Sequence, residues 1–296
     1  MAEAVVLPSV GAVLGGRYRL AELIGTGTSG AVFRALRDDG PAFAIKVLRR
    51  DALAHDELRR RFEREASALS TLTHPNVIGV LELGEVEGAP FLVMELLEGE
   101  TLDALLSREN LAPEVSVEIA DQLLAGLAHA HAHGILHRDV KPANVFLARQ
   151  PSGGRIAKLL DFGLVKFGHG SAFGVHTTLT ERGAILGTPA YMSPEQVLGR
   201  EVDARTDVYA AGVVLFELMT GTWPFVEEDV TDMFRAHARD PVPALGSVRE
   251  GLVTRPELDA LVRKAMAKRP PDRFADAREM RIALARVPRP VARLGG

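Results

Sequence analysis

A short segment near the middle of the chain groups residues that can act on a phosphoryl group. It reads His-Arg-Asp-Val-Lys-Pro-Ala-Asn over residues 137–144, and Asp-Phe-Gly follows at residues 161–163. Phosphoryl transfer needs a carboxylate near the incoming hydroxyl, a cation on the phosphate and oxygen ligands for Mg²⁺. These groups are present in the segment as Asp139, Lys141, Asn144 and Asp161.

A glycine-rich stretch of the form G-x-G-x-x-G-x-V occupies residues 25–32. Glycines let backbone N–H groups approach phosphate oxygens, although this signal alone is weak. A dinucleotide-binding site would need a helix that begins inside the loop and an acidic residue about 20 positions later. A second strand pattern and then Lys46 follow instead, an order that favours a phosphate-covering loop with a phosphate-pairing lysine over a plain flexible turn.

Lys46 lies in a predicted strand over residues 43–47, where Ala44 shares its face by parity and can floor a pocket for a base. A helix is predicted over residues 56–71, and Glu65 is its only glutamate that falls within the apolar stripe. A carboxylate on a buried face is costly without a partner. We therefore predict an ion pair between Lys46 and Glu65.

The glycine loop, the strand lysine, the 137–144 segment and the Asp-Phe-Gly tripeptide occur here in one fixed order. In this order the chain resembles the eukaryotic-type protein kinase family, most closely its bacterial serine/threonine members, over nearly its whole length. The resemblance implies an α+β, bilobal fold with a small β-rich N-lobe that carries one main helix, and a larger, mainly α-helical C-lobe. It also implies transfer of the γ-phosphate of ATP, with Mg²⁺, to Ser or Thr hydroxyls of protein substrates.

The resemblance also implies roles for individual residues. Asp139 would accept or orient the substrate proton, and Lys141 would steady the γ-phosphate in the pattern of serine/threonine rather than tyrosine kinases. Asn144 and Asp161 would bind the metal, while Lys46 and Glu65 would complete the catalytic set. In the expected nucleotide site Met94 is the gatekeeper, backbone groups of Glu95 and Leu97 face adenine, and Phe146 lies at the floor. The whole site consists of Ile24, Gly25, Thr26, Gly27, Thr28, Ser29, Gly30, Ala31, Val32, Ala44, Lys46, Met94, Glu95, Leu97 and Phe146.

Residues 161–195 resemble an activation loop. It closes with Ser193-Pro194-Glu195, where the family usually has Ala-Pro-Glu, and Glu195 is expected to pair with Arg273. Asp207 resembles the aspartate that braces the backbone of the catalytic loop.

Arg138 directly precedes the catalytic aspartate, and kinases with this arginine are commonly switched by a phosphate on the activation loop. We therefore predict autophosphorylation of Thr180, with Thr178 as a second acceptor. The alternative is a solvated loop of hydroxyl groups.

Composition narrows the choice of partner and location. The net charge of −4, with charged residues at 25% and both signs interspersed, gives no electrostatic reason to expect nucleic acid. Cysteine is absent, which excludes disulfides and thiolate chemistry and is compatible with a cytoplasmic location. No apolar run approaches the roughly 18 residues that span a bilayer, so no membrane segment is expected. Dimerisation stays open.

The remaining patterns supply the elements that must position these residues. Strands are expected at residues 31–34, 43–47, 78–83 and 91–95, and helices at residues 113–133, 207–220, 257–267 and 275–285. The 207–220 pattern lacks a polar face, which indicates a helix buried all round. We expect an N-terminal extension over residues 1–16, a kinase domain over residues 17–286 with lobes of about 17–97 and 98–286, and a linker or tail over residues 287–296.

Two other functions and one other site fit the sequence less well. A pseudokinase that serves as a nucleotide-binding or partner-binding scaffold would typically lack a lysine, aspartate or metal ligand that is present here. A kinase of small molecules is disfavoured by residues 187–195, which in the family hold a peptide acceptor. A metal site at His129, His131 and His133 lacks an evident further ligand, so we expect a helix end there instead.

Overall fold

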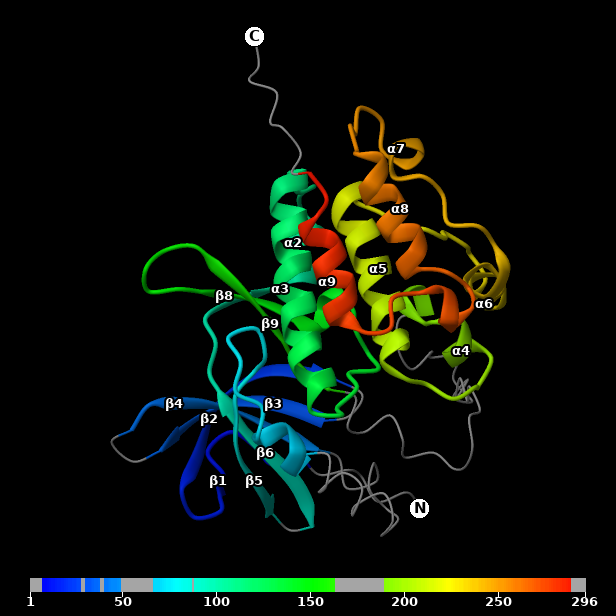
Figure 1. Cartoon of the computed structure of the whole chain (residues 1–296). Helices are drawn as coiled ribbons and strands as arrows, with labels where there is room; N and C mark the ends of the chain where they lie inside the picture. The colour runs from blue at the N-terminus through cyan, green and yellow to red at the C-terminus, as the bar shows by residue number, and fades with distance from the viewer. Residues whose placement is uncertain are drawn as a thin grey trace. The chain divides into compact units, whose positions relative to one another are not determined.

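Residues 7–27, 30–37, 40–48, 66–86, 88–162 and 189–288 are described by the structure, which is a computed structural model. The chain divides into two units, with the division between Glu98 and Gly99. The N-terminal unit is built on a β-sheet, and the C-terminal unit is mainly helical (Figure 1). The predicted α+β, two-lobed class is confirmed.

A six-stranded antiparallel sheet in the order β1-β2-β3-β4-β6-β5 forms the N-terminal unit. All four predicted strands fall on strands of this sheet, β3 to β6. The strands are β1 (Val13–Leu14), β2 (Tyr18–Gly27), β3 (Gly30–Arg37), β4 (Ala42–Leu48), β5 (Val80–Val86) and β6 (Ala89–Glu95).

The sheet begins before residue 17, the position at which the sequence predicted the kinase domain to start. Strand β1 pairs with β2, and the N–H of Gly11 donates to the carbonyl of Leu20 at 2.8 Å. The side chain of Leu14 is only 1% exposed and belongs to the core of the sheet. Part of the expected extension over residues 1–16 is therefore a strand, because an apolar side chain and backbone hydrogen bonds hold it there.

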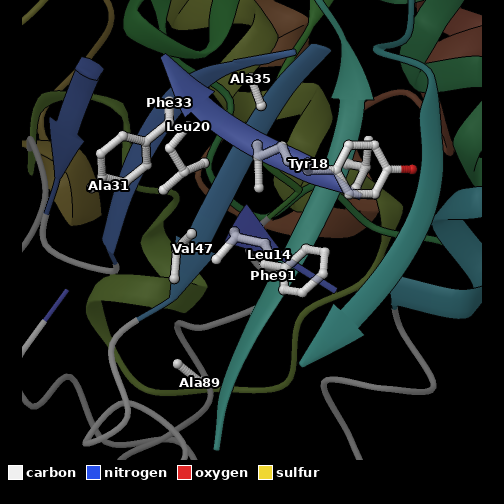
Figure 2. Close-up of a cluster of buried hydrophobic side chains, with 11 residues drawn as sticks. Leu14, Tyr18, Leu20, Ala31, Phe33, Ala35, Val47, Ala89 and Phe91 are labelled. Carbon is white, nitrogen blue, oxygen red and sulfur yellow. The ribbon is translucent and has the colours of Figure 1, made fainter. Parts of the chain in front are cut away.

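One face of this sheet carries a cluster of buried apolar side chains, and Figure 2 shows Tyr18, Leu20, Phe33 and Phe91 among them. On β4 the cluster receives Ile45 and Val47, which are fully buried. Alternate residues of a strand point to opposite faces, so Ala44 and Lys46 take the other face. The face predicted for nucleotide is thus separate from the core.

Of the helix predicted over residues 56–71, the structure describes residues 66–70 as helical. Ala66 and Leu69 are buried there, and Leu72 is buried just beyond. These three positions belong to the predicted apolar stripe. Glu65 lies outside the described residues.

Long helices dominate the C-terminal unit, and the four that the sequence predicted are α3, α5, α8 and α9. The helices, with the short 3₁₀ segments η2 to η4, are α2 (Leu102–Leu106), α3 (Pro113–Ala132), η2 (Pro142–Asn144), η3 (Pro189–Tyr191), α4 (Pro194–Val197), α5 (Ala204–Thr220), α6 (Val230–Arg239), α7 (Leu245–Val248), α8 (Pro256–Ala265), η4 (Pro270–Asp272) and α9 (Ala277–Ala285).

Helix α5 lies at the centre of this unit and packs against α3, α8 and α9 (Figure 1). Its apolar residues are buried around the whole circumference, as predicted. The helix begins at Ala204 rather than at Asp207, because Asp203 caps it by accepting the N–H of Arg205 at 2.8 Å. Gly221, with φ of +79°, ends it in the left-handed conformation.

The sequence did not predict the second sheet or helix α6. Strands β7 (Gly99–Thr101), β8 (Val145–Arg149) and β9 (Arg155–Leu159) form a three-stranded antiparallel sheet. These strands are short and depend on tertiary pairing more than on their own pattern. Helix α6 is amphipathic, with five apolar residues among its ten, and this pattern was missed.

Of the tail predicted over residues 287–296, only the first two residues are described. No helix in the described ranges combines the length and apolarity needed to cross a membrane.

Gly30 supplies a test of the β2–β3 hairpin, because a Cβ at this position would lie 2.0 Å from the carbonyl oxygen of Val47. Its φ of +155° is also one that L residues rarely adopt. We expect Gly30→Ala to lower the free energy of unfolding by about 2 kcal/mol or more. Gly27→Ala is the matched control, because no described atom lies within 4 Å of a Cβ there, and it should change stability by less than about 1 kcal/mol. Urea unfolding of both variants measures this, and equal losses would contradict the steric argument.

Candidate active site

The glycine-rich segment forms the end of the β2–β3 hairpin. Gly25 pairs with Val32 across the hairpin, and Gly27 pairs with Gly30. A strand therefore follows the loop, where a dinucleotide site would have a helix. Thr28 and Ser29, two of the predicted nucleotide contacts, lie outside the described residues.

Four predicted nucleotide residues share the sheet face that lies opposite the apolar core. Val32 is paired with Lys46 between β3 and β4, and Ala44 is paired with Met94 between β4 and β6. Directly paired residues in an antiparallel sheet project on the same side. A lysine, a small residue and two apolar side chains are thereby gathered on one surface.

Glu95 is held within the N-terminal unit at two atoms. Its backbone N–H donates to the carbonyl of Gly79 at 3.0 Å, and its Oε1 accepts the N–H of Gly79 at 2.8 Å. The N–H of Glu95 is therefore not available to a base, which narrows the expected backbone contacts with adenine.

Asp139, Lys141 and Asn144 lie together in the C-terminal unit. The Nδ2 group of Asn144 donates to the backbone carbonyl of Asp139 at 2.8 Å and to its Oδ2 at 3.0 Å. Lys141 Nζ lies 3.1 Å from the same Oδ2. The two donors orient the carboxylate, and because the amide nitrogen of Asn144 faces Asp139, its Oδ1 faces another direction and can ligate a cation.

His137 links this loop to the segment that carries Asp161. Its Nε2 lies 2.8 Å from the carbonyl oxygen of Leu160, so Nε2 carries the proton, and Nδ1 accepts the N–H of Asp139 at 3.3 Å. Burial lowers the pKa of His137, which keeps the ring neutral. The N–H of Leu160 donates to the carbonyl of Asn144 at 2.8 Å. Asp161, the next residue, is therefore held close to the loop that carries Asn144, the other candidate metal ligand.

Asp207 accepts hydrogen bonds from the backbone of the catalytic loop. Oδ2 accepts the N–H of His137 at 2.8 Å, and Oδ1 accepts the N–H of Arg138 at 2.7 Å. Burial alone would raise the pKa of Asp207, but the hydrogen bond from His131 and the contacts with His137 outweigh it and place the pKa below its ordinary value. Arg138 has a φ of +62°, a left-handed conformation that costs about 1–2 kcal/mol and that these bonds sustain.

The histidines considered for a metal site have other roles. His131 Nε2 lies 2.9 Å from Asp207 Oδ2, and its Nδ1 accepts the N–H of Ala277 at 3.4 Å. His131 therefore joins α3 to α5 and to the start of α9. His129 and His133 contact each other with tilted rings, whose centroids are 4.6 Å apart. Within the described residues, no group of three or more His, Cys, Asp or Glu could hold a metal ion.

The predicted pair between Glu195 and Arg273 is present and almost completely buried. Nη1 of Arg273 lies 2.7 Å from Oε1, and Nη2 lies 2.8 Å from Oε2. Thr206 adds a hydroxyl that donates to Oε1 at 2.7 Å. Burial alone would raise the pKa of Glu195, but Arg273 and Thr206 lower it, so the carboxylate stays charged.

Ser193, which replaces the usual alanine, caps helix α4. Its hydroxyl accepts the N–H of Gln196 at 3.3 Å, and the Gln196 side chain accepts the N–H of Ser193 at 3.0 Å. Gln196 Nε2 also donates to the carbonyl of Arg138 at 3.0 Å. Ser193 therefore caps the helix at the end of the predicted activation loop, and Gln196 connects this helix to the catalytic loop.

Sequence reasoning assigned no role to His131 or Gln196. Helical phase could have identified His131, since it lies on the face of α3 that carries the buried residues Leu124 and Leu127. Nothing in the sequence pairs Gln196 with the catalytic loop.

Other predicted residues take separate positions. Phe146 lies on β8, opposite Thr101 of β7. Ile24 lies on β2 and is 45% exposed. Glu65, Thr178 and Thr180 lie outside the described residues.

Comparison with known proteins relates this geometry to a family. The family model described as "Protein kinase domain" matches residues 18–282. The Myxococcus xanthus serine/threonine-protein kinase pkn3 is 38% identical over 93% of this chain and 50% of its own length. The Mycolicibacterium smegmatis serine/threonine-protein kinase PknB is 39% identical over 93% of this chain and 43% of its own length. The chain thus spans half or less of these curated relatives.

A solved structure has the same architecture. The kinase domain of Mycobacterium tuberculosis PknI superposes with a TM-score of 0.71 at 28% identity, over 94% of this chain and 99% of that one. The match therefore includes both the β-sheet unit and the helical unit.

The buried ion pair leads to a prediction on stability. Arg273→Met would leave Glu195 buried without its partner and should lower the free energy of unfolding by about 3–5 kcal/mol. The control is Arg281→Met, which removes the exposed pair of Arg281 with Asp121 at 2.8 Å and should cost less than about 1 kcal/mol. Urea unfolding measures the stability of both variants. Similar losses of unfolding free energy would contradict the argument that burial makes the Arg273 pair the more costly one to break.

The lowered pKa of Asp207 leads to a prediction on pH dependence. Its stabilising contribution is complete above the unfolded-state pKa of about 3.9 and is lost as pH falls through the lower folded-state pKa. We expect wild type to exceed Asp207→Asn in unfolding free energy near neutral pH, and this difference to shrink as pH falls below about 4. Urea unfolding across this pH range is the measurement, and a difference that grows with acidity would contradict the assignment.

Proposed function

We propose, from the premise that this chain belongs to the protein kinase domain family, that it transfers the γ-phosphoryl group of ATP to serine or threonine hydroxyls of proteins. The observation that carries the proposal is the arrangement of Asp139, Lys141 and Asn144. A carboxylate oriented by two donors, beside a cation and a potential metal ligand, suits phosphoryl transfer.

In this mechanism Asp139 accepts the proton of the substrate hydroxyl as the hydroxyl oxygen forms its bond to the γ-phosphorus. The bond between that phosphorus and the β–γ bridging oxygen breaks, and ADP leaves. Lys141 offsets negative charge on the transferred group and, through its contact with Oδ2, helps to hold the carboxylate in place.

Asn144 and Asp161 would hold Mg²⁺, because their oxygens are the hard donors that this ion prefers. The hydrogen bonds of Asn144 Nδ2 to Asp139 support this role, since they orient the amide so that Oδ1 faces away. Mg²⁺ supplies charge neutralisation on the phosphate oxygens when it is bound.

ATP would be bound by the β2–β3 hairpin and by the face that Val32, Ala44, Lys46 and Met94 share. Lys46 would contact the α- and β-phosphates, with Glu65 as its ion-pair partner. The remaining nucleotide contacts are those expected from the family resemblance.

Serine and threonine are proposed as acceptors because Lys141 follows Asp139 by two residues and because the curated relatives are named serine/threonine kinases. The presence of Lys46, Asp139, Asn144 and Asp161 favours catalysis over the scaffold role of a pseudokinase. The substrates are proteins in the cytoplasm, and Thr180 and Thr178 are acceptors in an autophosphorylation reaction.

Asp139→Asn tests the proposal. We expect wild type with Mg-ATP to phosphorylate a generic protein substrate and to carry phosphate at Thr180, Thr178 or both. The variant should lose at least about 100-fold in rate, because the amide cannot accept the proton, and should lack the loop phosphate. Radiolabel transfer and mass spectrometry measure the two results.

The control for this experiment is Asp232→Asn, which makes the same change at an exposed position on α6. It should leave the rate unchanged. Equal phosphate transfer by wild type and Asp139→Asn would indicate a contaminating kinase and overturn the assignment. An active wild type without phosphate on either threonine would overturn the autophosphorylation sites alone.

A further inference from the structure

Three arginines of the C-terminal unit lie around one glutamate on its surface. Arg108, which follows α2, contacts both carboxylate oxygens of Glu100, with Nη2 to Oε1 at 2.7 Å. Arg155 on β9 places Nη1 3.2 Å from the same Oε1. Arg149 on β8 contributes positive potential at this carboxylate and, with the other two, lowers the pKa of Glu100. We call Arg108, Arg149 and Arg155 the arginine cluster.

Strand register places two of these positive charges directly opposite one another. Arg149 is the cross-strand partner of Arg155, and Glu100 is the partner of Leu147. Since Leu147 and Arg149 are two residues apart on β8, Glu100 and both arginines project from the same face. Like charges in a directly opposed pair destabilise a sheet.

A contribution to folding stability does not explain why three arginines surround Glu100. Glu100 is already paired in bidentate fashion with Arg108, and the second carboxylate nearby, that of Glu109, is 3.9 Å from Arg108 Nη2. Exposed ion pairs contribute about 0–1 kcal/mol, so a further arginine pair adds little stability. Residues that break a local rule without a compensating gain in stability tend to mark functional surfaces.

The cluster is also exposed and held in position. Arg108 and Arg155 have side chains that are 48% and 47% exposed. Strand β9 packs against α3, while the turn of the β8–β9 hairpin projects beyond the helices of its own unit (Figure 1). Its turn is closed by hydrogen bonds from the N–H of Gln150 to the carbonyl of Gly154 at 3.1 Å and from Gly153 to Gln150 at 3.0 Å. The guanidinium groups are therefore presented to solvent on a defined scaffold.

We infer that the arginine cluster is a docking surface for an anionic segment of a protein substrate. Guanidinium groups bind carboxylates and phosphates through paired N–H donors. A glutamate-rich or phosphorylated segment would therefore neutralise the positive charge of the cluster that Glu100 does not neutralise. A protein segment is favoured over nucleic acid because the chain as a whole carries a net charge of −4. This inference deepens the proposed function, because it assigns a means of substrate selection to the kinase.

Binding measured by fluorescence anisotropy tests the inference without any need for catalysis. The probes are a fluorescein-labelled hexaglutamate peptide and a labelled peptide with two phosphoserines, each titrated with the whole chain. We expect Arg149→Glu with Arg155→Glu to weaken binding of at least one probe by tenfold or more, and the neutral pair Arg149→Gln with Arg155→Gln to weaken it less. The ratio between the probes tells carboxylate from phosphate recognition.

The matched control is Arg263→Glu with Arg278→Glu, which makes the same charge change on exposed residues of α8 and α9. It should alter affinity by less than twofold. An equal loss of affinity in the two double variants would show unspecific attraction and refute the site. Unchanged affinity in the cluster variant would also refute it. Tighter binding of single-stranded RNA than of either peptide would also overturn the assignment to a protein segment.

A kinetic comparison separates this inference from the proposed function. A neutral peptide substrate and the same peptide with a hexaglutamate tail would be phosphorylated by wild type and by the cluster variant. The cluster variant should raise KM for the tailed peptide alone, with kcat unchanged. Absence of any phosphate transfer in wild type would overturn the proposed function, while the anisotropy result would still decide the docking surface.

Discussion

The site of the C-terminal unit depends on one buried carboxylate, that of Asp207. It lies in the first turn of α5, where the helix dipole favours a negative charge, and it accepts from His131, His137 and Arg138. Because α5 is buried all round, this carboxylate has a fixed position. The catalytic loop is therefore held against the helix, even though Arg138 must adopt a left-handed conformation to reach it.

A second buried charge acts on the same helical turn. Thr206, next to Asp207, donates to Glu195, and Arg273 donates both to Glu195 and to the carbonyl of Arg205 at 3.0 Å. Glu195 and the distant Arg273 thus meet at the start of α5. The cost of burying these charges is offset only because each has hydrogen-bond partners, so the loss of one partner should affect the others.

The arginine cluster presents the opposite electrostatic situation. Its charges lie at the surface, and Arg149 and Arg155 oppose one another across the β8–β9 hairpin while Glu100 is shared among the cluster. Such an arrangement contributes little to folding, whereas the buried carboxylates contribute to it through satisfied bonds. Stability and the proposed recognition of substrate are therefore assigned to different parts of the same unit.

The sequence by itself determined the family, the two-lobed class, the long helices and the Glu195–Arg273 pair, because these follow from motif order and from strong apolar periodicity. Tertiary structure decided the rest. The strands β7 to β9 are too short to be specified locally, and β1 is held by its pairing with β2. Contacts such as His131 with Asp207 and Gln196 with Arg138 join residues 76 and 58 positions apart, and only packing brings such residues within hydrogen-bond distance.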